Sequence, residues 1–156
     1  MKPSLVAAVS TFAVVAQAAD FEGKGQLRAL WNDPVHMGED LGCITQEGFW
    51  TVDEDKCGTF TSEKSTTATY PLQIKGELGY CQPSPFDCTK SAQITPGFST
   101  WVDVTVPGRG VLVSGNGGIY ASNTGNNPPL PGEVSRIKFY SGTEKGRWIW
   151  LGWKAL

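Results

Sequence analysis

No stretch of ten or more residues after residue 18 places its apolar side chains at the period of 3.6 that an amphipathic helix requires. Short runs of β-branched, aromatic and aliphatic residues instead alternate with glycine, proline and asparagine, which end strands and form turns. The chain has 19 glycines and 10 prolines, too many for long helices. This pattern predicts an all-β protein, built as a small antiparallel barrel or sandwich.

Several runs have the spacing of strands. In the first of them Leu27, Ala29 and Trp31 alternate on one face. The Asn-Gly-Gly at residues 116–118 indicates a tight turn. The segment SNTGNNPPLPG, residues 122–132, holds three prolines that fix φ and remove hydrogen-bond donors, so it is predicted to lie outside the sheet. The predicted strands are residues 25–31, 49–52, 66–74, 100–106, 111–113, 137–140 and 147–153.

The first 18 residues have the pattern of a secretory signal peptide. Lys2 supplies a positive charge, residues 5–15 form an apolar core, and Ala16-Gln17-Ala18 matches the small-residue site that signal peptidase cuts. The apolar core is shorter than the ~20 residues that span a bilayer, and no later run is long enough. We therefore expect residues 1–18 to be removed and residues 19–156 to form one extracellular domain that does not associate with a membrane.

All four cysteines, Cys43, Cys57, Cys81 and Cys88, follow the predicted signal peptide. In an oxidising compartment an even number of cysteines usually forms disulfides, and four cysteines allow three pairings. We favour Cys43–Cys57 and Cys81–Cys88, because each closes a short loop, which stabilises by roughly 3 kcal/mol on the loop-entropy model. A zinc site is disfavoured because His36 is the only histidine, and a catalytic thiol would lack its histidine base.

Four motifs in the first half of the chain resemble part of a known enzyme family. They are FEGKGQLRAL at residues 21–30, GCITQEGFW at residues 42–50, CGTFT at residues 57–61 and GYCQPSPFDC at residues 79–88. In this order they resemble the C-terminal accessory domain of fungal RNase T₂-like enzymes, with its F-x-G-x-G-x-L strand, G-C-[LI]-x-x-x-G-x-W segment, [AG]-T-F-T after a second cysteine, and later cysteine pair. The resemblance is looser over residues 111–140 and does not extend to residues 147–156. It implies a small β domain that accompanies catalysis without performing it.

The catalytic residues of those ribonucleases are missing from this chain. The enzymes use histidines as acid and base, whereas this chain has only His36, in NDPVHMGED. A serine hydrolase is also disfavoured, since there is no G-x-S-x-G motif. The formal net charge is −2, becoming −3 when Lys2 is removed, and both signs are scattered. Because no basic patch is available to neutralise phosphates, we expect no nucleic-acid binding.

Acidic side chains offer an alternative function. Paired carboxylates hydrolyse glycosides when they face one cleft about 5 to 9 Å apart. However, adjacent acids in a strand point to opposite faces and acids in a turn are usually solvated, and a calcium loop would need a spaced D-x-D-x-D-G pattern. We expect no metal and no cofactor, and keep a small secreted hydrolase of wall polysaccharide, acting through the acidic turn at residues 53–55, as the alternative. The acidic residues concerned are Glu39, Asp40, Asp53, Glu54 and Asp55.

The C-terminal sequence RWIWLGW has two interpretations. On a strand, Trp148 and Trp150 share one face and Ile149 lies on the other. If the Ile149 face is core, the indoles project outward as a platform for a sugar, and Trp148, Trp150 and Trp153 are candidate ligand-binding residues. If the tryptophans are core, the strand fills a small barrel or is buried on both faces, and Gly152 permits a bulge that redirects Trp153. We favour the core interpretation.

Taken together, the patterns predict a secreted all-β domain with two local disulfides and no catalytic activity. Export, small size, disulfides and aromatic strands are typical of binding modules and of effector-like proteins. We expect it to act as a binding or accessory module whose ligand is a polysaccharide, the cell wall or an extracellular host protein.

Overall fold

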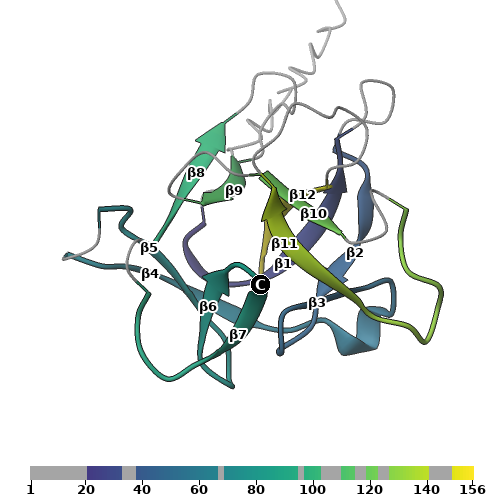
Figure 1. The fold of residues 1–156 in the computed structure, drawn as a ribbon, viewed down its shortest axis with the longest axis horizontal. Helices are drawn as coiled ribbons and strands as arrows, with labels where there is room; N and C mark the ends of the chain where they lie inside the picture. The colour runs from purple at the N-terminus through teal and green to yellow at the C-terminus, as the bar shows by residue number, and fades with distance from the viewer. Residues whose placement is uncertain are drawn as a thin grey trace, which may run out of the picture.

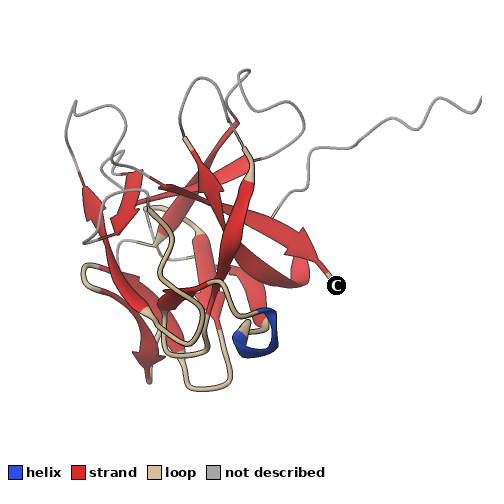
Figure 2. Cartoon of the chain, turned by 90° about the vertical axis from the view of Figure 1, so that its right-hand side faces the viewer, coloured by secondary structure: helices blue, strands red, loops and turns tan. Residues whose placement is uncertain are grey.

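The computed structural model describes residues 21–32, 38–66, 69–94, 97–102, 110–114, 119–122, 127–140 and 149–156. Strands dominate these ranges, and the one helical element within them is a single 3-10 turn, η1 (Glu54–Lys56), drawn in blue in Figure 2. Within the same ranges, no helix has the length and apolar character needed to cross a membrane. The predicted all-β class is confirmed.

The described strands form one connected sheet of 12 strands, and every pairing in it is antiparallel. In chain order the strands are β1 (Gly23–Trp31), β2 (Asp40–Ile44), β3 (Phe49–Thr51), β4 (Phe60–Lys64), β5 (Leu72–Lys75), β6 (Tyr80–Pro83), β7 (Phe86–Lys90), β8 (Phe98–Val102), β9 (Gly110–Ser114), β10 (Ile119–Ser122), β11 (Ser135–Tyr140) and β12 (Ile149–Ala155).

Six of the strands close into a barrel. Each pairs with the next in the order β1, β12, β9, β8, β5, β4, and β4 pairs back onto β1 (Figure 1). The longest ladder joins β1 to β12, running without interruption from Gly25 opposite Ala155 to Trp31 opposite Ile149. Closure pairs both sides of every barrel strand, so the barrel itself has no open edge. Of the two predicted architectures, the barrel is the one that forms.

Further strands extend the sheet outside the barrel. Strands β2, β3, β11 and β10 continue from β1, while β6 and β7 continue from β5. The two extensions meet where the Cys88 N–H donates to the Glu47 carbonyl, with N···O 3.2 Å. Gly48 makes this approach possible, because its φ is +99° and a Cβ there would lie 3.1 Å from the Cα of Asp87. The hairpin β6–β7 therefore packs against the β2–β3 turn.

Both predicted disulfides are present. Cys43 on β2 bonds to Cys57, just after η1, and Cys81 on β6 bonds to Cys88 on β7. No free cysteine is found among the described residues. The two bonds are compatible with an extracellular protein.

One predicted strand is wrong and several strands were missed. Residues 66–74 do not form a single strand: β4 ends at Lys64 and β5 starts at Leu72. The Ser65 N–H donates to the Pro71 carbonyl at 2.6 Å, which closes the connection between them. Pro71 has no N–H for a ladder, so it belongs outside the strands. The missed strands are β2, β4, β6, β7 and β10, which are short and mix polar with apolar residues.

Residues 127–132 of the proline-rich segment lie outside the sheet as predicted. The prediction is wrong for the first residue of the segment, because Ser122 ends β10 and pairs with Ile137, and residues 123–126 lie outside the described residues. The turn predicted at residues 116–118 lies outside the described residues.

The barrel core is built from the inward faces of its strands. On β1 and β12 these are Leu27, Ala29, Ile149, Leu151 and Trp153, whose exposed fractions are 5% or less. The outward face of the same wall carries a second, smaller apolar cluster. Its members are Leu30, Val111, Val113 and Trp150. Strand β12 is therefore buried on both faces.

Two of the three C-terminal tryptophans, Trp150 and Trp153, lie in β12. Trp150 and Trp153 are each 5% exposed, so neither presents an open ring to a sugar, and their burial favours the core interpretation. Trp153 packs on Phe21, with ring centroids 5.4 Å apart. The bulge at Gly152 does not occur, because Gly152 stays in register with β1. This glycine is needed for another reason: a Cβ there would lie 2.5 Å from a methyl carbon of Leu30.

Candidate functional site

A cleft of about 630 Å³ opens on the outer side of the barrel beside the first disulfide. We call it the Arg28 cleft. The residues that line it are Arg28, Asp40, Leu41, Gly42, Val52, Glu54, Pro128 and Lys154.

Arg28 lies at the base of this cleft because of the alternation along β1. Its neighbours Leu27 and Ala29 point into the barrel, so the Arg28 side chain points out. The Arg28 side chain is nevertheless buried, with only 8% of it exposed, because β2 and η1 cover it. A guanidinium buried to this degree requires acidic partners.

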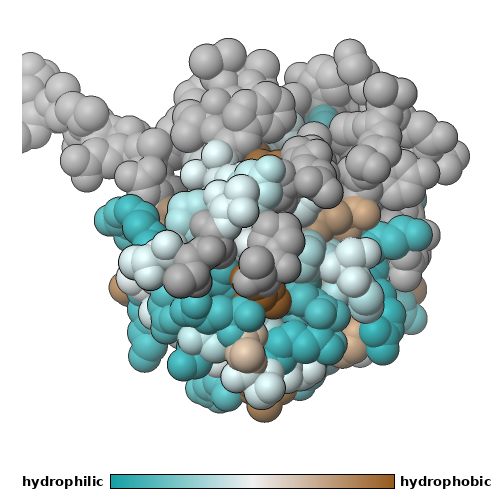
Figure 3. All heavy atoms as spheres, turned by 60° about the vertical axis from the view of Figure 1, so that its left-hand side comes forward, coloured by the Kyte–Doolittle hydropathy of each residue, from teal (hydrophilic) through white to brown (hydrophobic). Residues whose placement is uncertain are grey.

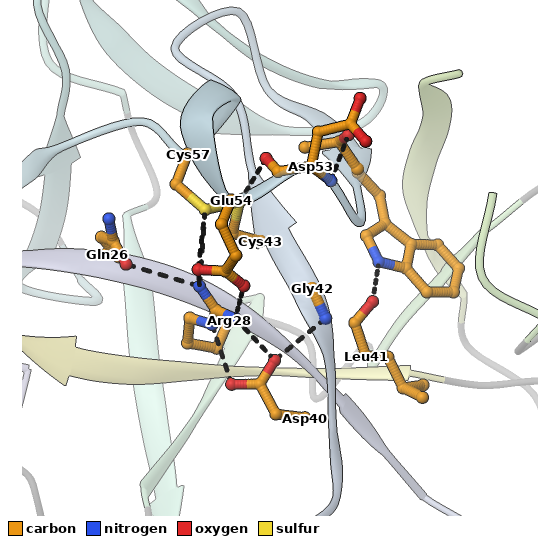
Figure 4. Close-up of polar contacts among 11 residues, drawn as sticks. Gln26, Arg28, Asp40, Leu41, Gly42, Cys43, Asp53, Glu54 and Cys57 are labelled. Carbon is orange, nitrogen blue, oxygen red and sulfur yellow. Dashed lines mark hydrogen bonds and ion pairs between the residues drawn. A yellow bond between two sulfur atoms is a disulfide. The ribbon is translucent and has the colours of Figure 1, made fainter. Parts of the chain in front are cut away.

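Two carboxylates hold the guanidinium from opposite sides (Figure 4). Nε and Nη2 donate to Oδ2 and Oδ1 of Asp40 at 2.8 and 2.9 Å. Nη1 donates to Oε2 of Glu54 at 2.9 Å, and Nη2 also donates to Oε1 of Glu54. Weaker contacts from Nη1 reach Gln26 and the sulfur of Cys57, each at 3.4 Å. Both acids thus bind in the bidentate geometry that is strongest for arginine.

Local backbone features aim Asp40 at Arg28. The register between β1 and β2 shifts between Arg28 and Leu30, which is a bulge that redirects the start of β2. The Gly42 N–H donates to Oδ1 of Asp40 at 2.9 Å, and Gly42 adopts φ +111° where a Cβ would lie 2.1 Å from the Thr51 carbonyl oxygen. The Trp50 indole N–H holds the adjacent Leu41 carbonyl at 2.9 Å.

The three acids of the turn at residues 53–55 have different surroundings. Asp53 accepts from Lys56 Nζ at 2.7 Å and from the Gly132 N–H at 3.0 Å, which links the turn to the proline-rich loop. Glu54 points to Arg28, and Asp55 is exposed. The turn does not supply a carboxylate pair by itself. The acid that accompanies Glu54 at the cleft is Asp40, from a different strand.

The charges in the cleft stabilise the ionised forms. Hydrogen bonds from Arg28 lower the pKa of Glu54 below its ordinary value of 4.5, although partial burial acts in the opposite direction. The hydrogen bond with Glu54 raises the pKa of Arg28 further, against its burial. A general acid for glycoside hydrolysis needs the opposite shift, a carboxyl pKa that is raised. Glu54 therefore suits ion pairing and hydrogen-bond acceptance rather than proton donation.

The opposite side of the barrel, over β4, β5 and β8, is mainly polar. Figure 3 shows that the visible described surface there is mostly hydrophilic, with apolar atoms only in small separate areas. A second cleft, of about 400 Å³, lies on this side. Its lining residues are Phe21, Glu22, Lys64, Pro71, Leu72, Phe98, Ser99 and Thr100. Small apolar areas of this kind are usual on protein surfaces and do not mark an interface.

Two further residues considered in the sequence analysis cannot be compared with the structure. Trp148 and His36 lie outside the described residues. In the ranges that the structure describes, no three His, Cys, Asp or Glu side chains are grouped so as to hold a metal ion. Sequence reasoning missed Arg28 and Lys154. The available signal was an arginine between the apolar residues Leu27 and Ala29 of a predicted strand, since a buried arginine must find acids elsewhere in the chain.

Comparisons with protein-family models, with curated proteins and with solved structures were made for the whole chain. None of them gives a match. The similarity to the accessory domain of RNase T₂-like enzymes stays a prediction, resting on the sequence motifs alone.

Proposed function

We propose that this protein is a secreted, non-catalytic binding module that holds a polysaccharide chain in the Arg28 cleft. The supporting observation is the fixed array of planar polar groups at the base of a cleft of about 630 Å³. Because Arg28 locks both carboxylates in place, they are already ordered before a ligand arrives. Preordered groups lose little side-chain entropy on binding.

The carboxylates keep capacity for ligand hydrogen bonds. An ionised carboxylate has about four acceptor sites. The contacts to Arg28 use two on each group, and the Gly42 N–H uses a third on Asp40. The side chains of Asp40 and Glu54 remain 40% and 62% exposed, so further sites face the solvent. Sugar hydroxyls can donate to these oxygens and accept from Lys154, while Leu41 and Val52 offer apolar contact to the C–H face of a sugar ring.

Secretion rests on the signal-peptide pattern of residues 1–18 together with the two disulfides. The accessory-domain resemblance also favours a module without its own chemistry. Its motifs fall on β1, on β2 to β3, on the start of β4 and on the β6–β7 hairpin. Nucleic acid is the less favoured partner because the formal net charge is −2 and no basic patch stands out in the sequence.

Binding assays on the protein lacking residues 1–18 test this proposal. We expect retention on at least one insoluble wall polymer from a set of chitin, cellulose and β-1,3-glucan, and binding of its soluble oligosaccharide by calorimetry. Lys154→Ala and Glu54→Gln should each weaken binding about tenfold, the value of a hydrogen bond to a charged group. Lys75→Ala is the matched control, since Lys75 is exposed on β5 and does not line the cleft. Absence of retention on every polymer would overturn the proposal.

The hydrolase alternative predicts a different result in the same samples. Prolonged incubation with each polymer would release reducing sugars, and Glu54→Gln would abolish the release. We expect no release above the buffer control, because Arg28 keeps the Glu54 carboxyl ionised.

A further inference from the structure

The proline-rich loop before β11 presents an ordered, exposed segment, of which only the first residue, Pro128, lines the Arg28 cleft. Its sequence is Pro128-Pro129-Leu130-Pro131. In Figure 1 the lime-coloured chain leading into β11 runs along the right-hand edge of the molecule, away from the barrel. Pro128, Leu130 and Pro131 are exposed, Leu130 by 66%, and Pro129 alone is intermediate.

The prolines of this segment favour an extended backbone of the polyproline II type. Each proline fixes φ near −65°, and each residue before a proline is pushed into the extended region. One or both of these proline effects act on every position from Asn127 to Pro131. A polyproline II helix repeats every three residues, so Pro128 and Pro131 lie on the same edge. Both are exposed, which leaves a Pro-x-x-Pro edge and the Leu130 side chain facing outward.

The end of the segment is tied to the protein. The Asp53 carboxylate accepts from the Gly132 N–H, at 3.0 Å to Oδ2 and 3.3 Å to Oδ1. The Thr51 hydroxyl donates to the Glu133 carbonyl at 3.3 Å, and the Glu133 N–H donates to the Leu130 carbonyl at 2.9 Å. The last of these bonds closes a turn of residues 130–133, so Pro131 lies inside an ordered turn. A docked partner therefore meets a segment that is already ordered, which lowers the entropy cost of binding.

We propose that residues 128–131 are a docking surface for a protein whose groove is lined by aromatic side chains and binds polyproline II helices. Such grooves take prolines between parallel rings and give a pocket to an intervening apolar residue. Leu130 would fill that pocket. Glu133 is the one charged residue of the sequence from 127 to 134, so a groove that also carries a cation beside its rings fits best.

Binding of purified WW and SH3 domains, which have such grooves, tests the proposal by calorimetry. At least one of them should bind the wild-type protein, and the double variant Leu130→Ala/Pro131→Ala should weaken the interaction at least about tenfold, as expected of a central anchor. Val134→Ala is the matched control. This side chain is also aliphatic and exposed, by 49%, but lies beyond the prolines, so the affinity should not change.

A second measurement does not depend on the folding of the variants. An excess of the free peptide NNPPLPGEV, residues 126–134, should displace the wild-type protein from the domain, whereas a scrambled peptide should not. Neither Leu130 nor Pro131 lines the Arg28 cleft, so polysaccharide retention should survive the double variant. Failure of all WW and SH3 domains to bind, or equal binding by the double variant, would overturn this inference and leave the proposed function untouched.

Discussion

At the scale of single residues, the molecule depends on one buried charge. The Arg28 side chain is 8% exposed, while its partners Asp40 and Glu54 are 40% and 62% exposed. The energetic consequences of breaking this cluster are therefore unequal. Losing the acids leaves a cation without counter-charge inside the protein, whereas losing the arginine leaves acids that water can reach.

This asymmetry gives the first prediction. The double variant Asp40→Asn/Glu54→Gln should lose about 3 to 5 kcal/mol of unfolding free energy, the usual cost of an uncompensated buried charge. Arg28→Met, which keeps the volume of the side chain, should lose less. Urea denaturation at pH 7 of the two variants beside wild type measures both. A larger loss in Arg28→Met would contradict the burial argument.

The second prediction concerns acid pH. The folded protein holds the pKa of Glu54 below its ordinary value of 4.5, so its stabilisation is complete above pH 4.5 and is lost as the pH falls through the lower, folded-state pKa. Because the Glu54 side chain is largely exposed to solvent, its ion pair contributes less than about 1 kcal/mol to the free energy of unfolding. Urea midpoints between pH 7 and pH 2 should fall less steeply for Glu54→Gln than for wild type. If the urea midpoints of the two proteins fell equally with pH, Glu54 would not contribute to the loss of stability in acid.

At the scale of elements, β12 holds two apolar layers together. Ile149, Leu151 and Trp153 face the barrel core, and Trp150 faces the outer cluster on β1 and β9. Glycines make this packing possible, because a Cβ on Gly25 would lie 2.4 Å from a ring carbon of Trp153. Removing a large side chain from either face leaves a cavity.

The third prediction follows from burial on both faces. Trp150→Ala should cost about 3 to 5 kcal/mol, and Trp153→Ala and Ile149→Ala should be similarly severe, as large-to-small changes in packed interiors are. Denaturation midpoints of the three variants decide the matter. A wild-type midpoint for Trp150→Ala beside a collapsed Ile149→Ala would mean that the outer face of β12 is open and available to a ligand.

At the scale of the whole molecule, a closed barrel carries two extensions, and each extension has its own disulfide. Cys43–Cys57 spans a sequence separation of 14 and lies directly over Arg28, whereas Cys81–Cys88 spans 7 and lies in a hairpin outside the barrel. The longer loop restrains the unfolded chain more. The first disulfide also contacts Arg28 at the base of the cleft, so we expect the two bonds to differ in their effect on function.

The fourth prediction compares the two bonds. Cys43→Ala/Cys57→Ala should destabilise by about 3 kcal/mol or more and weaken polysaccharide retention, since it uncovers Arg28. Cys81→Ala/Cys88→Ala should cost about 2 to 3 kcal/mol and leave retention unchanged. Chemical denaturation and the polymer assay measure the two effects. Loss of retention only in the second variant would place the ligand at the β6–β7 hairpin instead.

The sequence by itself determined the all-β class, both disulfide pairings and the position of the proline-rich loop. These features depend on local signals, namely the side-chain period, proline chemistry and the closure of short loops between cysteines. The strand predicted at residues 66–74 was wrong. Residues there have β propensity, but the segment includes the connection between β4 and β5, which ends at Pro71.

Only the tertiary structure decided which faces of β12 are buried and where Arg28 finds its acids. Trp150 lies against Leu30 and Val111, and Arg28 meets Asp40 and Glu54, which are 12 and 26 positions away in the chain. The alternation of side chains along a strand shows that its two faces differ. Whether a face is buried depends on what packs against it. That cover comes from segments distant in the sequence, namely β2 and η1 over Arg28 and β9 beside Trp150, and no local pattern encodes these contacts.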